Sequence, residues 1–213
     1  MANLHDIVQW CNQTLKANEF KDYAPNGLQI EGKSKVNKIV CAVTASEDAI
    51  DAAIAQQADA LLVHHGYFWK GEPYPITGMR GNRIKKLIQN NISLIAYHLP
   101  LDAHPDLGNN AQLARLMGWT PEGRFGEQDI GWHGHVAESM MLDELTRQIG
   151  NELKRTPLVI GNGAKAIRHI AWCSGGAQSY FEQALALGVD AFVSGEISEQ
   201  HVHLARESGV AYI

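Results

Sequence analysis

Two short segments of this chain each consist of an apolar run followed by histidine. They are Ala60-Leu-Leu-Val-His64-His65-Gly66 and Ile95-Ala-Tyr-His98-Leu-Pro-Leu-Asp102. Each segment is typical of a buried strand that is followed by potential metal ligands. Three imidazoles and one carboxylate suit a borderline divalent metal ion, which accepts nitrogen and oxygen donors together. The sequence therefore predicts a metal site formed by His64, His65, His98 and Asp102.

The convergence of these ligands depends on where their strands end. Side chains alternate between the two faces of a strand, so His64 and His65 can converge only where the strand stops. Gly66 permits a bend there, and two neighbouring metal ions would also accommodate two divergent imidazoles. The proline between His98 and Asp102 removes a helical hydrogen bond and favours an extended turn. A single histidine in an apolar strand is usually a core residue, but two such strand ends together favour a shared site.

Strands alternate with helices along most of the chain. The hydrophobic periodicity and the capping residues predict helices over His5–Leu15, Ser46–Gln57 with Ser46 as N-cap, Arg83–Asn90 and Asn109–Met117, and strands over Lys38–Val43, Ala60–His64 and Ile92–Tyr97. Continuous apolar strands in a βαβ order predict an α/β fold with a parallel sheet covered on both faces. Ligands bind such sheets at the carboxyl ends of the strands, where the candidate ligands lie.

The second half of the chain repeats the beginning of the first. Segments Ile39–Ala60 and Ile170–Ala191 align without a gap, with identical residues at five positions that include Asp59 and Asp190. Either a true duplication or two ordinary βαβ units would explain this. The glycine-rich stretch Thr120–Gly134 lacks periodicity, so we expect two lobes, residues 1–122 and 123–213.

Composition excludes several classes of function. The chain has 213 residues, 45% of them hydrophobic, and a formal net charge of −5, which gives no bulk attraction to nucleic acid. It shows neither an export signal nor an apolar run of about 18 residues, so no membrane span is expected. Cys11, Cys41 and Cys173 are scattered and are expected to be reduced thiols in a cytoplasmic protein, the latter two buried in strands.

Two further groups of residues allow alternative interpretations. The aromatic run Tyr67–Trp69 could stack on a heteroaromatic ring or could cover the metal with apolar surface. Basic residues follow it and could bind phosphate or form a solvated helix face. These are Lys70, Arg80, Arg83, Lys85 and Lys86.

These segments together resemble a known family, the GTP cyclohydrolase type 2-like, or Nif-three-like, dinuclear metal-binding proteins. The matching motifs are Asp22-Tyr-Ala-Pro-Asn-Gly-Leu-Gln-Ile-Glu-Gly32, Val43-Thr-Ala-Ser46, Asp59-Ala-Leu-Leu-Val-His-His-Gly66, His98-Leu-Pro-Leu-Asp102 with Gly108-Asn-Asn110, and Ala171-Trp-Cys-Ser-Gly-Gly176 with Val193-Ser-Gly-Glu196.

The resemblance implies two interlocked, related α/β lobes with mainly parallel central strands. It also implies two divalent metal ions held by His64, His65, His98 and Asp102, and a ring-like homohexamer. Zinc, iron, manganese and nickel all fit these ligands. Family members complete the site from a C-terminal segment with histidine and glutamate. Because the stretch Glu207–Ile213 reads as a helix end, a glycine stop and the start of a strand, we expect that the chain is truncated after residue 213.

The expected function is metal-dependent hydrolysis, of the cyclohydrolase type, of a nucleotide-like small molecule such as GTP. The attacking group would be a metal-bound water, and no side chain is assigned a catalytic role. The alternative is a non-catalytic, ring-shaped metal-binding scaffold or regulatory protein, with a DNA-repair role as a special case. The net negative charge counts against a nucleic-acid partner unless the ring has a locally basic bore.

Overall fold

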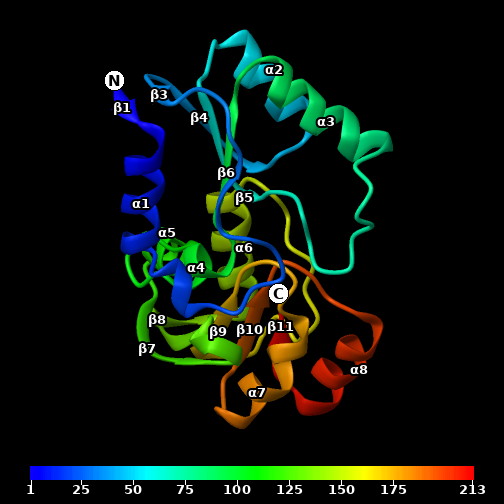
Figure 1. The fold of residues 1–213 in the computed structure, drawn as a ribbon. Helices are drawn as coiled ribbons and strands as arrows, with labels where there is room; N and C mark the ends of the chain where they lie inside the picture. Colours follow the sequence, from blue (N-terminus) through cyan, green and yellow to red (C-terminus); the bar gives the residue numbers. More distant parts are fainter. The chain divides into compact units, whose positions relative to one another are not determined.

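The computed structural model describes residues 1–213 and divides into two compact units, Met1–Leu101 and Asp102–Ile213 (Figure 1). This boundary differs from the one expected after residue 122. Residue 122 lies within strand β7 (Thr120–Phe125), which pairs with β8 (Gly131–Met141). The glycine-rich stretch is therefore a hairpin of the second unit. Its glycines reflect close packing, because a Cβ on Gly134 would collide with the carbonyl oxygen of Thr120.

The first unit is built on a four-stranded sheet. In spatial order the strands are β2 (Gly27–Ile30), β6 (Ser93–Ala96), β5 (Ala60–His65) and β4 (Ile39–Thr44). Strands β4, β5 and β6 run parallel, and β2 runs antiparallel to β6. A second, small sheet pairs β1 (Ala2–Asn3) with β3 (Lys35–Val36).

Helices cover both faces of the four-stranded sheet. Helix α1 (Leu4–Thr14), which is followed by a 3-10 turn η1 (Ala17–Glu19), packs its apolar stripe on Ile95 and Tyr97. Helices α2 (Glu47–Ala55) and α3 (Gly78–Gln89) pack on the other face (Figure 1). As the sequence predicts, Ser46 caps α2, because its side chain accepts a hydrogen bond of 3.2 Å from the Ala49 amide.

Strand β4 is less covered than its apolar sequence predicts. It lies at the edge of the sheet, and Val43 keeps 69% of its surface exposed. Cys41 is exposed as well, which corrects the expectation that it is buried. Cys173, in β9, is buried as expected.

The second unit has a five-stranded mixed sheet. Its strands lie in the order β11 (Ala211–Tyr212), β10 (Ala191–Ser194), β9 (Ala166–Cys173), β8 and β7. The first three run parallel, while β8 is antiparallel to both of its neighbours. The chain is therefore a mixed α/β protein with parallel central strands in both units.

Helices also cover the second sheet. They are α5 (Asn109–Met117), α6 (Leu142–Leu153), α7 (Phe181–Ala186) and α8 (Glu199–Ser208), with 3-10 turns η2 (Glu127–Asp129) and η3 (Gln178–Tyr180). Helices α5 and α6 join the core around Trp132, Ile170 and Trp172. On α7, Phe181 stacks on Phe192 of β10 with ring centroids 5.7 Å apart.

The end of the described chain follows the expected pattern. Helix α8 ends at Ser208, and Gly209 takes a left-handed conformation with φ of +68°. A glycine adopts this conformation without the steric penalty of a Cβ. Strand β11 follows and pairs parallel to β10. None of the helices is both long and apolar enough to span a bilayer.

Candidate metal centre

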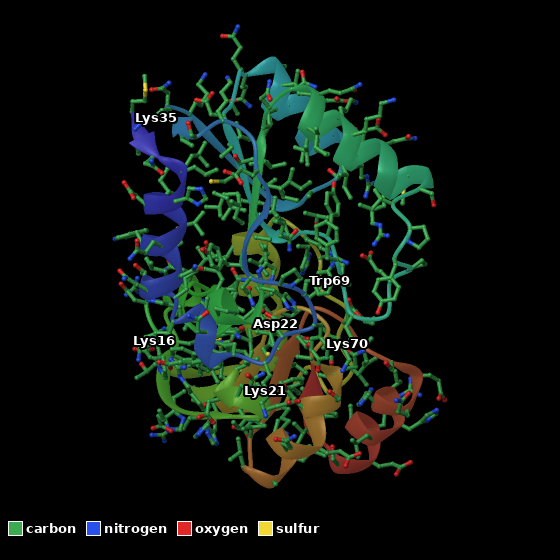
Figure 2. All side chains as sticks on the ribbon, viewed as in Figure 1. Lys16, Lys21, Asp22, Lys35, Trp69 and Lys70 are labelled. Atoms are coloured by element: carbon green, nitrogen blue, oxygen red, sulfur yellow. The ribbon has the colours of Figure 1, made fainter.

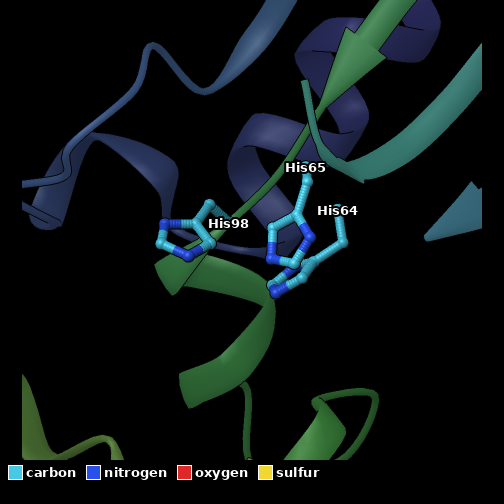
Figure 3. A group of neighbouring side chains, drawn as sticks. All are labelled: His64, His65 and His98. Atoms are coloured by element: carbon cyan, nitrogen blue, oxygen red, sulfur yellow. The ribbon is translucent and has the colours of Figure 1, made fainter. Parts of the chain in front are cut away.

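Three of the predicted ligands lie together in the first unit. His64 and His65 are the last residues of β5, and His98 follows the neighbouring parallel strand β6. The ring centroids are 4.5 Å apart for His64 and His65, 5.1 Å for His64 and His98, and 5.7 Å for His65 and His98. One nitrogen atom from each ring lies within 4.8 Å of the other two. Figure 3 shows the three rings gathered at this point.

Each of the three rings is held through its Nδ1 atom. His64 Nδ1 lies 2.9 Å from the carbonyl oxygen of Tyr97, to which it donates a hydrogen bond. His98 Nδ1 lies 2.7 Å from the Asp22 carboxylate, and His65 Nδ1 lies 3.2 Å from the Thr44 hydroxyl. Histidines that bind metals are usually oriented by such a contact on the nitrogen that does not coordinate. The pattern assigns Nε2 of each ring as the potential ligand atom.

The loop that begins at Asp22 fixes His98 in place. Asp22 accepts hydrogen bonds of 2.9 Å from the Asn26 side chain and the Leu99 amide, and the His98 amide donates to Asn26 at 2.8 Å. Burial acts to raise the pKa of Asp22, but the hydrogen bonds from His98, Asn26 and Leu99 outweigh it and lower the pKa to about 2. Asp22 is therefore an ionised partner of His98. The turn motif at Pro25-Asn26-Gly27 marks this loop in the sequence, but as a bare sequence it reads equally well as a connector.

Gly66 and Gln29 position the end of β5. A Cβ on Gly66 would collide with the side chains of Gln29 and Ala96, so the need for glycine is one of space. Gln29 accepts a hydrogen bond of 2.7 Å from the Tyr67 amide and donates one of 3.1 Å to the Tyr67 carbonyl. This side chain thus pairs with the backbone as a neighbouring strand would, and it holds the double histidine in register.

The aromatic run after the double histidine forms a wall beside it. The Trp69 ring lies 5.0 Å from the His98 ring, edge to face, and 6.0 Å from the His65 ring. Its indole nitrogen donates to the Gly66 carbonyl at 3.1 Å. Figure 2 shows Trp69 and Asp22 in the same region of this unit. Tyr67 is buried, with its hydroxyl donating to the Ala45 carbonyl at 2.6 Å, so this geometry favours a covering role for the run.

Two of the basic residues that follow are engaged with carboxylates. Arg80 donates to Glu72 at 2.7 Å, and Lys86 lies 3.2 Å from Glu47 and also 2.5 Å from Asp51. These pairs favour the interpretation as a charged surface over a phosphate site.

Asp102 is the first residue of the second unit, and the helix α4 (Leu99–Ala103) contains it. The extended turn that Pro100 predicts is wrong, because this segment is helical. Pro100 lies in the first turn of α4, where the missing N–H needs no helical partner. The Asp102 carboxylate is buried, and it accepts hydrogen bonds from the Asn109 amide group at 2.7 Å and from the Ser174 hydroxyl at 3.3 Å.

Asn110 organises the surroundings of Asp102, a role that sequence reasoning missed. Asn110 is fully buried; its Oδ1 atom accepts from the Ser174 amide at 2.7 Å, and its Nδ2 donates to the Ile130 carbonyl at 3.0 Å. Its own carbonyl accepts from the indole of Trp172 at 3.0 Å. Asn110 and Ser174 both lie in motifs that the sequence analysis names, Gly108-Asn-Asn110 and Ala171-Trp-Cys-Ser-Gly-Gly176, but only the fold shows that the two motifs meet.

Comparison with known proteins supports the resemblance. The sequence of residues 2–213 matches the family described as Duf34/NIF3 (NGG1p interacting factor 3). A protein of Neisseria meningitidis called GTP cyclohydrolase 1 type 2 homolog is 52% identical, over 100% of this chain and 86% of its own length. A protein of the same description from Pseudomonas aeruginosa is 49% identical, over 99% of this chain and 84% of its own.

Solved structures agree with this match. The structure described as protein ybgI, of unknown function, superimposes with a TM-score of 0.95 at 46% identity, over 99% of this chain and 85% of that one. The structure of TTHA1606 from Thermus thermophilus gives a TM-score of 0.89 at 31% identity, with the same coverage of 99% and 85%. The agreement in sequence and in fold extends over both units, and the chain therefore belongs to the Duf34/NIF3 family.

Proposed function

We propose that this protein binds two divalent metal ions through His64, His65, His98 and Asp102 and uses them to hydrolyse a nucleotide-like small molecule. The observation that carries the proposal is the cluster of three imidazoles, each held through Nδ1 by an oxygen atom. Hydrogen-bonded core histidines need not converge, whereas a metal site requires convergence and an outer contact on each ring.

The donor set fits a borderline divalent ion. Imidazole and carboxylate donors without a thiolate suit zinc, iron, manganese or nickel. Asp102 joins the set because it follows His98 by one helical turn in sequence and is a buried carboxylate with hydrogen-bond donors on Oδ1. When bound, a pair of such ions would act as Lewis acids and lower the pKa of a coordinated water to about 7, which suits hydrolysis.

The residues around the cluster have separate roles in this proposal. Asp22 keeps the His98 ring in one orientation and carries negative charge behind it. Trp69 shields one side of the rings from water, which strengthens the electrostatic interactions inside the site. Gln29 and Gly66 set the backbone from which His64 and His65 project.

GTP is the first substrate to test, because the similar curated proteins are described as GTP cyclohydrolase 1 type 2 homologs. The chain is loaded with zinc, manganese, iron or nickel, and ring opening of GTP is followed by chromatography. His98→Ala should lose bound metal and at least roughly 100-fold in turnover, since a ligand contributes more than its outer partner. The matched control is His5→Ala, an exposed residue that pairs with Glu31 at 3.3 Å in the same unit and should change neither.

Metal binding without turnover of any nucleotide would contradict the proposed hydrolase activity. It would leave the second interpretation, a non-catalytic metal-binding ring. We propose the ring-like homohexamer from the family resemblance, and light scattering of the native protein tests it. The expected location is the cytoplasm, where thiols such as Cys41 stay reduced.

A further inference from the structure

Three histidines share one face of the sheet in the second unit. His133 and His135 come from β8, and His169 comes from β9. On β8 they alternate with Trp132 and Val136, which are buried in the core. Because side chains alternate along a strand, the histidines lie on the face opposite this core.

The strand register brings the three rings together. His135 lies directly opposite His169, and His133 lies opposite Ala171, so His133 and His169 are diagonal neighbours. The ring centroids of His135 and His169 are 5.0 Å apart, and those of His133 and His169 are 5.5 Å apart. His133 Nδ1 lies 3.3 Å from His169 Nε2.

A β-bulge adds a carboxylate to this face. The pairing of β7 with β8 shifts between Pro121 and Gly123, which leaves Glu122 as the extra residue. Bulges of this kind redirect a side chain. Glu122 lies 2.9 Å from His135 Nε2, and its carboxylate and one nitrogen from each of His133 and His169 all lie within 4.8 Å of one another.

We propose that Glu122, His133 and His169 form a second metal site that binds one zinc-like divalent ion, with His135 as the positioning residue for Glu122. The 3.3 Å between the two nitrogen atoms fits this. It equals the edge of a tetrahedron whose bonds are about 2.05 Å long, the length of a zinc–imidazole bond. Two imidazoles and one carboxylate are also a common zinc donor set, in which the fourth position stays open.

The backbone around these residues favours coordination. A Cβ on Gly123 would collide with the His133 ring, so the glycine leaves space for that ring beside β7. Asp190 fixes the backbone of β9 at this point, because its carboxylate accepts a hydrogen bond of 3.0 Å from the His169 amide.

The competing interpretation is a hydrogen-bonded cluster without metal. An N–H of one imidazole could donate to the other across 3.3 Å, and His135 could form an ion pair with Glu122. This cluster would hold no zinc, so a zinc count separates the two interpretations.

The test uses the full chain with the first centre removed by His64→Ala and His98→Ala. After loading with zinc and extensive dialysis, this protein should retain one zinc per chain, and the further change His169→Asn should remove it. Substitution with Co²⁺ should give the visible absorption of a four-coordinate site in the same two proteins, present in the first and absent in the second. The matched control is His203→Asn, since His203 forms an exposed pair with Glu199 at 2.9 Å in the same unit.

The outcomes separate this proposal from the proposed function. No zinc in the His64→Ala, His98→Ala protein overturns the second site whatever the wild type binds, and so does zinc that survives His169→Asn. An equal zinc count in the wild type and in the His64→Ala, His98→Ala protein would instead count against the first centre. If His169→Asn prevents folding, His133→Gln serves in its place. His135→Gln should weaken zinc binding roughly 10- to 100-fold and leave the Co²⁺ spectrum in place, as expected for an outer partner.

Discussion

Asp59 and Asp190 occupy equivalent places in the two units. The Asp59 carboxylate accepts hydrogen bonds from the amides of Asn37 and Lys38 at 2.9 and 3.3 Å. The Asp190 carboxylate accepts from the amides of Arg168 and His169 at 2.9 and 3.0 Å. Each aspartate directly precedes the second parallel strand of its unit and ties it to the strand before it.

The strand register repeats in the same way. Ile39 pairs with Ala60, and Ile170 pairs with Ala191, at the same sequence offset as the two aspartates. Two ordinary βαβ units have no reason to share a register, a carboxylate and both of its amide donors. The structure therefore favours duplication, which the five sequence identities left open.

Asp59→Asn should destabilise the first unit by about 1–3 kcal/mol at pH 7, the cost of impairing a buried hydrogen-bonded carboxylate. The bond from Lys33 at 2.8 Å and those from the Asn37 and Lys38 amides lower the pKa of Asp59 below its ordinary value. Its contribution to stability is therefore present above about pH 4, the pKa of an unfolded aspartate, and is lost as the pH falls further. Denaturant unfolding at a series of pH values measures this.

The control for this change is Asp51→Asn. Asp51 is half exposed and pairs with Lys86, so its loss should cost less than about 1 kcal/mol. A difference between Asp59→Asn and wild type that stays constant from neutral pH to below about pH 3 would contradict the role assigned to the Asp59 charge.

Asp22→Asn should weaken metal binding at the first centre by roughly 10- to 100-fold while the protein stays folded. Asparagine keeps the shape of the side chain but removes the charge that orients His98. Competition with a chelator of known affinity measures the change, and circular dichroism checks the fold. Glu31→Gln, on an exposed pair with His5, should bind metal as the wild type does. Equal metal affinities for the Asp22→Asn and Glu31→Gln proteins would show that Asp22 does not contribute to the metal site.

Gly66→Ala should cost about 1–3 kcal/mol, the usual cost of overpacking, and should lower metal occupancy as well. The added methyl group would push Gln29 or Ala96 away and displace the end of β5. Thermal unfolding and metal analysis measure the two effects. Gly150→Ala is the matched control, because Gly150 lies inside α6 with space for a Cβ and should gain up to about 1 kcal/mol in helix propensity.

Cys41 should react with a thiol reagent in the folded protein, whereas Cys173 should react only on unfolding. Cys41 is exposed on the edge strand β4. Burial, with a further contribution from Asp102, raises the pKa of Cys173 to about 12, so almost no thiolate forms. Labelling followed by peptide mass analysis gives the order. Fast modification of Cys173 in the native state would show that β9 opens more readily than its packing implies.

The sequence was most informative where one physical pattern acts alone. Helix Asn109–Met117 was predicted with its observed bounds, because an amphipathic stripe follows a glycine and ends before another. The three histidines were found because ligand-type residues at two strand ends are rare by chance, and parallel strands bring those ends to one edge. Their metal remains a prediction.

Packing overrode the local signals elsewhere. The glycines between Thr120 and Gly134 read as a linker, but they allow close approach inside a hairpin, as at Gly134. Pro100 predicted a break in the helix, but it lies in the first turn of α4. Glu122 carried no signal, because it reaches the three histidines of the second unit only through a bulge that the sequence does not reveal.

The two-way pairing of Gln29 with Tyr67 predicts how the first unit should behave when no metal is bound. In a zinc finger the chain collapses only around the cation, so a chelator unfolds it. Here hydrogen bonds within the polypeptide already hold the double histidine, and a hydrophobic core lies beneath it. We therefore expect the metal-free protein to unfold cooperatively on heating. It should also bind added divalent ions rapidly, because the ligand side chains are already in position.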